Sequence, residues 1–153
     1  MKYGGSVPKQ CDVLVAHFIA DWRRDYDYMP EFIELANRFK TVIPLRHPAL
    51  IAVSHKKRDP NAGTGFLHKW TQMTQIPAFH FPMETKPFDA LEVYLEREVR
   101  RNEVTLGSIG EYKEKNSLKQ ARAFLGRDWW AVEAALDTEI GEWYYGDDIK
   151  AEA

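Results

Sequence analysis

The sequence predicts an α/β fold, in which helices flank a central mixed sheet and a helical extension follows at the C-terminal end. Three features carry this prediction: a nearly continuous apolar run over 12–19, an alternating apolar segment over 79–81 and helical spacing from 117 onward. Continuous apolar runs are typical of strands buried on both faces, whereas apolar residues three or four apart are typical of helices. The run over 12–19 leads into a helical pattern, so the loop between them is expected at the carboxyl end of the sheet, where α/β proteins usually keep their sites.

Length and composition limit the class of protein. The chain has 153 residues, which fits one domain, and 44% of them are hydrophobic, which is enough for a sizeable core. The formal net charge of −2 gives no electrostatic argument for a nucleic-acid partner or for binding to acidic membranes. No apolar run approaches the roughly 20 residues that a membrane-spanning helix needs, so no membrane span is expected.

The single cysteine excludes two kinds of site within one chain. Cys11 has no second cysteine to pair with, so a disulfide framework and a cysteine-based zinc site are both ruled out. Cys11 is either a small buried thiol or a reactive one, and we favour the buried thiol. The N-terminal sequence lacks the charged start and apolar core of a secretory signal, so the protein is expected to be intracellular and not secreted.

Composition shifts divide the chain into five predicted parts. A polar lead over 1–11 precedes a domain over 12–101, and a polar linker over 102–116 separates this domain from helices over 117–146. Residues 147–153 form an acidic tail.

The stretch that joins the first predicted strand to the first helix is rich in charge. His17 lies inside the strand, where a hydrogen-bonded interior histidine is expected rather than a metal ligand. Arg23 and Arg24 then stand where a helix begins, either as a site for an anion or a partner or as surface residues paired with the neighbouring aspartates. We favour surface pairing, with Asp27 as the N-cap of a helix that Pro30 helps to start and that continues towards Phe39.

The middle of the chain alternates apolar runs with turns. The run over 41–45 contains Pro44, which predicts an edge strand or a loop, and a second apolar run follows over 50–54. A short helix is expected over 66–75, a strand over 79–81 and a longer helix over 87–101.

The C-terminal third is predicted to hold two helices with a rich aromatic content. Gly126 and Asp128 are expected to mark the end of the first helix and the N-cap of the second. The aromatic side chains either pack on the protein's own sheet or dock on another chain, since tryptophan and tyrosine are favoured interface anchors. Some of these side chains can pack on the sheet while others dock on another chain, so both possibilities stay open.

Two short segments resemble the thioredoxin-like superfamily. Phe18-Ile19-Ala20-Asp21-Trp22 is similar to the family's lead-in to its active site, and Ile76-Pro77-Ala78-Phe79 is similar to the segment that carries its cis-proline. The resemblance implies a three-layer thioredoxin-like fold over 12–101, in which the run over 50–54 is the next strand. It also places Pro77, in the cis form, beside the loop that begins at Trp22. It also implies a redox-inactive member, because Arg23-Arg24-Asp25-Tyr26 stands where the family has its two cysteines.

The chain carries no recognisable catalytic motif. It has no GxSxG, HExxH, P-loop or Rossmann pattern, so we predict no enzyme activity, no cofactor and no metal. The resemblance then implies a structural or accessory subunit of a larger protein assembly, in the cytosol or on the mitochondrial matrix side. The alternatives are a peptide-binding, chaperone-like module that uses Pro77, and a glutathione-transferase-like enzyme that uses Tyr26 or Arg23. The residues predicted to bind partner proteins are Trp22, Arg23, Arg24, Tyr26, Pro77, Trp129, Trp130, Trp143, Tyr144 and Tyr145.

Overall fold

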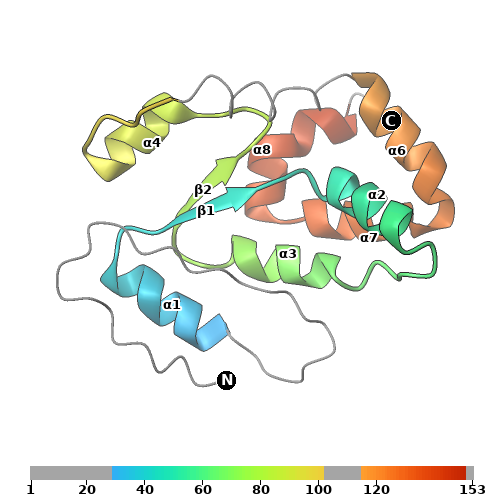
Figure 1. Cartoon of the computed structure of the whole chain (residues 1–153), viewed down its shortest axis with the longest axis horizontal. Coiled ribbons are helices and arrows are strands. Elements are labelled where there is room, and N and C mark those ends of the chain that lie inside the picture. The colour runs from blue at the N-terminus through green and yellow to red at the C-terminus, as the bar shows by residue number, and fades with distance from the viewer. Residues whose placement is uncertain (1–28, 102–114, 151–153) are drawn as a thin grey trace.

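A computed structural model describes residues 29–101 and 115–150, with side chains over 29–101 and 118–146. In this part of the chain, helices surround a sheet of two parallel strands (Figure 1). The predicted three-layer thioredoxin-like fold with a central mixed sheet is therefore wrong for the residues described. The predicted strand over 12–19, Cys11, His17 and the charged loop that follows lie outside the described residues.

The sheet pairs β1 (Val42–Leu45) with β2 (Phe79–Pro82) in parallel, so that Val42 lies opposite Phe79 and Leu45 opposite Pro82. β1 is the run predicted to be an edge strand or a loop, and β2 contains the predicted strand over 79–81. Each strand holds a proline, Pro44 or Pro82, which removes a hydrogen-bond donor from the backbone. Both strands of a two-stranded sheet are edge strands, so each can keep its proline.

Helix α2 (Pro48–Arg58) replaces the strand predicted over 50–54. Pro48 occupies the first helical turn, where its missing N–H costs nothing and its fixed φ favours the helix. His47 caps this turn, because its side chain accepts a hydrogen bond from the backbone N–H of Ala49. A short apolar run does not distinguish a strand from a buried helix, and here the proline starts a helix rather than ending a strand.

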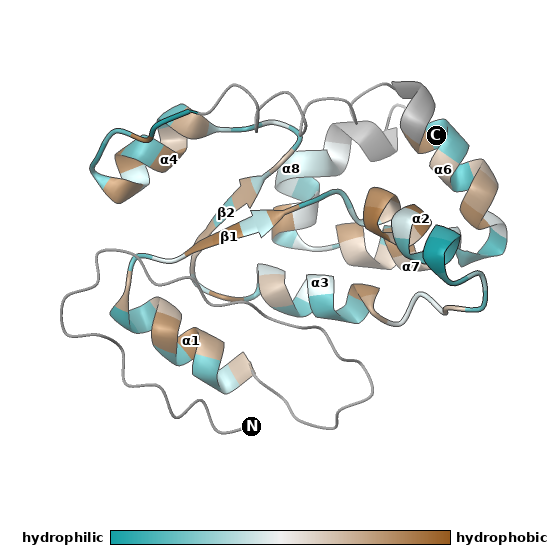
Figure 2. Ribbon diagram, in the orientation of Figure 1, coloured by the Kyte–Doolittle hydropathy of each residue, from teal (hydrophilic) through white to brown (hydrophobic). Residues whose placement is uncertain are grey.

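Two further helices agree with the predicted pattern. α1 (Met29–Arg38) falls within the predicted helical region, and Figure 2 shows hydrophobic and hydrophilic stretches alternating along it. Phe32 and Ala36 pack against the core from α1, although no residue of this helix is fully buried. α3 (Leu67–Thr74) confirms the short helix predicted over 66–75 and buries Leu67 and Trp70.

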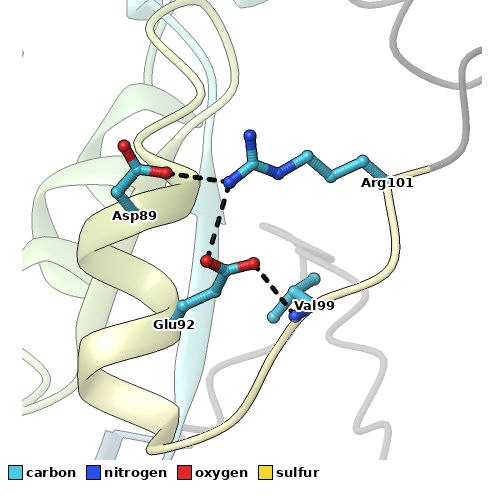
Figure 3. Close-up of polar contacts among 4 residues, drawn as sticks. All are labelled: Asp89, Glu92, Val99 and Arg101. Carbon is cyan, nitrogen blue, oxygen red and sulfur yellow. Dashed lines mark hydrogen bonds and ion pairs between the residues drawn. The ribbon is translucent and has the colours of Figure 1, made fainter.

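Helix α4 (Phe88–Leu95) is much shorter than the helix predicted over 87–101. Glu96 adopts a left-handed conformation with φ 55°, which ends the helix and turns the chain back. Figure 3 shows how the returning segment is held: Val99 N–H donates to Glu92 at 3.1 Å, and Arg101 pairs with Asp89 at 2.8 Å. Two carboxylates of α4, one of them in its first turn, therefore bind the segment that follows the helix.

The C-terminal part contains three helices and a 3-10 turn instead of two helices. α6 (Lys115–Leu125) ends in η2 (Gly126–Asp128), where Gly126 has φ 55°, so the predicted break at Gly126 is confirmed. α7 (Trp129–Leu136) is followed by α8 (Glu139–Lys150), and the break between them was not predicted. Thr138 makes this second break, because its hydroxyl oxygen accepts the N–H of Gly141 at 3.0 Å and so caps the start of α8.

The core lies where α2, α3, α7 and α8 meet the strands. Ile43 and Leu45 from β1 belong to one cluster of buried apolar side chains, together with Trp70 from α3 and Val132 from α7. α2 packs on α6 and α7, and α3 packs on α7. The other buried members of the cluster are Ala49, Ala52, Leu67, Ile76, Ala121, Leu125, Ala131, Ala135, Leu136 and Tyr145. The C-terminal helices therefore form part of the main core.

Candidate functional site

A group of polar side chains lies where the two parallel strands end. β1 continues into His47 and β2 continues into Glu84, so both residues leave the sheet at the same edge. One carboxylate oxygen of Glu84 accepts the backbone N–H of His47 at 2.8 Å, and the other accepts the hydroxyl of Tyr145 at 2.9 Å. We call His47, Glu84 and Tyr145 the strand-end cluster. It joins the exits of both strands to α8.

His47 is buried in this cluster, with 3% of its surface exposed. Its Nδ1 accepts the N–H of Ala49 at 3.1 Å, so the ring carries its proton on Nε2. Nε2 is buried and has no hydrogen-bond partner among the described residues. The ring meets that of Tyr145 edge to face, with centroids 4.8 Å apart. The histidine therefore packs as a neutral aromatic ring that also caps a helix.

Burial sets the protonation state of His47. Removing the imidazolium from water lowers the pKa of His47 from 6.5 to about 4. Protonation would also place a hydrogen on Nδ1, facing the N–H of Ala49 that this atom now accepts. His47 is therefore uncharged in the folded protein near neutral pH.

We expect this histidine to make the protein less stable in acid. Between pH 6.5 and pH 4 the unfolded chain binds a proton at His47 that the folded chain does not, so stability falls as the pH falls. The free energy of unfolding is expected to be lower by about 3 kcal/mol at pH 4 than above pH 6.5, because each unit of pKa difference corresponds to about 1.4 kcal/mol. Urea unfolding at several pH values measures it.

The variant His47→Asn provides the control for this prediction. Asparagine keeps an N-cap acceptor for the start of α2 but does not titrate. The pKa of the buried His80 is also lowered by burial, so some pH dependence is expected to remain in the variant. Equal pH dependence in the wild type and in His47→Asn would show that His47 is not the group responsible.

A second tyrosine also fixes α8 to the sheet. The hydroxyl of Tyr144 donates to the backbone carbonyl of His80 in β2 at 3.0 Å, and burial raises the pKa of Tyr144. On the other side of the cluster, Trp70 Nε1 donates to the carbonyl of Arg46 at 2.9 Å. The strand ends are thus tied to α3 and α8 by side chains that are themselves partly or fully buried.

The chemistry available to the strand-end cluster is structural. Both carboxylate oxygens of Glu84 accept bonds from the protein itself, and the ring of His47 is neutral and enclosed. Across residues 29–101 and 115–150, no group of three His, Cys, Asp or Glu side chains is placed to hold a metal ion. The cluster therefore acts as a clamp that sets the position of α8.

Two tryptophans on the helices behind this clamp face away from the core. Trp143 on α8 is 79% exposed and Trp130 on α7 is 65% exposed. The same helices bury Val132, Leu136 and Tyr145 on their inner sides. The backbone that carries the two tryptophans is therefore fixed by the core, while their indole rings remain in solvent.

The predicted partner-binding residues do not form one site. Trp22, Arg23, Arg24 and Tyr26 lie outside the described residues. Pro77 is exposed, and the peptide bond before it is trans, so the cis form implied by the resemblance is wrong. Of the aromatic residues, Tyr144 and Tyr145 bind within the chain, Trp129 is partly buried with Arg122 over its ring, and Trp130 and Trp143 are free of the core.

Sequence reasoning missed both His47 and Glu84. The pair His47-Pro48 carried a signal, because a polar residue directly before a proline is typical of an N-cap followed by the first residue of a helix. Glu84 carried none, because it stands among polar residues in a short turn and its role depends on Tyr145, which is 61 residues away.

Comparison with known proteins yields no match: no protein-family model, no curated protein and no solved structure is similar to this chain. The longest helix that the structure describes is α8, with 12 residues, and no described helix is long and apolar enough to cross a membrane.

Proposed function

We propose that this protein is a non-catalytic structural subunit of a larger protein assembly and that it docks through Trp130 and Trp143. The observation that carries the proposal is the exposure of these two indole rings, 65% and 79%, on helices whose other faces form the core. The lone cysteine supports a role without thiol redox chemistry, since a resolving cysteine is missing from the chain.

Preorganisation of the helices that carry the two tryptophans favours docking. A tryptophan buries about 150–250 Å² in an interface and loses few side-chain degrees of freedom when it does so. The strand-end cluster and the hydroxyl of Tyr144 fix α8 in place, so docking through Trp143 does not require this helix to be ordered first. Tryptophans at the centre of an interface commonly contribute about 2 kcal/mol or more each, which is about 30-fold in Kd.

We expect the variant Trp130→Ala/Trp143→Ala to fold normally but to lose its assembly partners. Exposed side chains away from the core usually change stability by no more than about 0.5 kcal/mol, so the unfolding curve should hardly move. Native purification of the tagged protein from its own cells, with quantitative mass spectrometry, measures which proteins accompany it at fixed stoichiometry.

A matched control variant removes apolar residues that are also exposed but lie elsewhere. Phe39→Ala/Val93→Ala changes residues that are 43% and 79% exposed, outside α7 and α8. This variant should retain the partners that the tryptophan variant loses. If the wild-type protein is recovered alone, or if both variants keep the same partners, the proposal is wrong.

The other predicted functions are not proposed. The peptide-binding and glutathione-transferase alternatives depended on a thioredoxin-like sheet, which the described residues do not form. The location in the cytosol or on the mitochondrial matrix side stays a prediction, and cell fractionation would test it.

A further inference from the structure

The two exposed tryptophans lie in opposite electrostatic surroundings, and this difference indicates what they bind. Trp130 is the second residue of α7 and follows directly after the corner where α2, α6 and η2 meet. An ion pair between Lys56 and Asp128 joins the last turn of α2 to η2, and the guanidinium of Arg122 lies 5.7 Å from the centre of the Trp129 ring. In Figure 1 the end of α2 lies beside the end of α6, and these two helices pack on one another.

Cationic side chains surround this corner. Lys57 and Arg58 follow Lys56 at the end of α2, and Arg127 precedes Asp128, so all three lie close to the ion pair. They are exposed and have no carboxylate partner among the described residues. The opposite charges near this corner are Asp59, which follows α2, and Glu133, one helical turn after Trp130 on α7. We call Lys57, Arg58, Arg127 and Trp130 the basic corner.

The surroundings of Trp143 have the opposite sign. Glu139 lies one helical turn before Trp143, and Glu142 directly precedes it. Both are exposed acids in the first turn of α8, and neither has a salt bridge to a described residue. We call Glu139, Glu142 and Trp143 the acidic face.

Resting on the proposed function, we propose that the first partner of this protein is a second copy of the same chain, with the basic corner of one copy bound to the acidic face of the other. Each surface places an exposed indole ring beside unpaired charges, and the charges of the two surfaces are complementary. The contact joins two different surfaces. It therefore forms either a closed pair with the contact made twice or a head-to-tail chain of copies.

The proposal predicts self-association that weakens with salt. Sedimentation velocity of the purified protein at about 200 μM would populate complexes with micromolar Kd. At about 50 mM salt we expect an average mass above the 17.8 kDa of one chain, falling towards 17.8 kDa at about 500 mM salt, as the Debye length shortens from about 14 Å to about 4 Å. A single species of 17.8 kDa at low salt overturns the proposal.

Charge reversal gives a sharper test. The variant Lys57→Glu/Arg127→Glu makes the basic corner acidic, and the variant Glu139→Lys/Glu142→Lys makes the acidic face basic. Alone, each variant brings like charges together and should sediment as a monomer. Mixed in equal amounts, the altered corner of one variant meets the altered face of the other, so association should return to the wild-type level.

Matched controls place the same charge changes on exposed residues elsewhere. Arg97→Glu/Arg100→Glu and Glu34→Lys/Glu98→Lys should associate as the wild type does. Variants that stay associated when alone, or that do not associate when mixed, overturn the proposal, and circular dichroism confirms that each is folded. If the purified wild type is a monomer but is recovered from cells in a complex with other proteins, the self-association is wrong while the proposed function stands.

Discussion

Replacing Gly141 with alanine is expected to cost about 3 kcal/mol of the free energy of unfolding, a large part of the stability of a small domain. A Cβ atom at this position would lie 2.5 Å from the carbonyl oxygen of Leu136 and 2.8 Å from its Cα. Both are backbone atoms and cannot rotate away, so the close packing of α8 on the end of α7 would have to open. Thermal or urea unfolding measures the loss.

Gly146 in the same helix provides the control. A Cβ atom there would meet only the Cγ of Glu142, at 3.4 Å, which is close to ordinary contact with a flexible side chain. Alanine is favoured over glycine inside a helix by about 0.5–1 kcal/mol, so Gly146→Ala should leave stability unchanged or raise it. If both substitutions have the same effect, α7 and α8 do not pack as described.

The second large effect is expected from Glu84→Ala, which removes the carboxylate of the strand-end cluster. The buried N–H of His47 and the hydroxyl of Tyr145 would both lose their acceptor. An unsatisfied buried polar group costs about 1–3 kcal/mol, so we expect the variant to lose about 2–4 kcal/mol in urea unfolding. Amide hydrogen exchange should also accelerate at His47, which a general loss of stability alone would not single out.

Two further variants separate this explanation from a simple surface effect. Glu84→Gln retains an acceptor for one of the two donors and should lose only about 1 kcal/mol. Glu98→Ala removes an exposed glutamate and should stay within about 0.5 kcal/mol of the wild type. A Glu84→Ala variant as stable as Glu98→Ala would show that the clamp contributes nothing.

Local patterns predicted the elements that local forces determine. The spacing of apolar residues located α3, the alternation of Phe79 and Phe81 located β2, and Gly126 located the end of α6. The run over 50–54 was wrongly assigned to a strand, because its four apolar residues, 50 to 53, fit a strand and a buried helix equally well. The predicted size of the sheet was wrong. That prediction depended on the resemblance of two short segments to the thioredoxin-like superfamily, and such segments do not determine how strands pair.

The candidate site was only partly predictable for a related reason. Aromatic content marked α7 and α8 as helices that must bury or bind something, but it did not say which rings do which. Residues two apart on a helix lie on nearly opposite sides, so Trp143 and Tyr145 have opposite fates, 79% and 1% exposed. The partner of Tyr145 is Glu84, and a contact across 61 residues has no local signature.

The two prolines of the sheet limit its pairing with strands of other molecules. The backbone N–H groups of Phe79 and Met83 donate to the carbonyls of Thr41, directly before β1, and of Leu45 in β1. By alternation, His80 and Pro82 of β2 and Val42 and Pro44 of β1 turn their backbone groups outward. Each outer edge of the described strands thus lacks one N–H donor, because a proline stands there. On the β2 edge, the outward carbonyl of His80 already accepts a hydrogen bond from the hydroxyl of Tyr144. A strand from another molecule could therefore not form a complete ladder of hydrogen bonds along either outer edge of the sheet. This protects against edge-to-edge aggregation and amyloid-like growth.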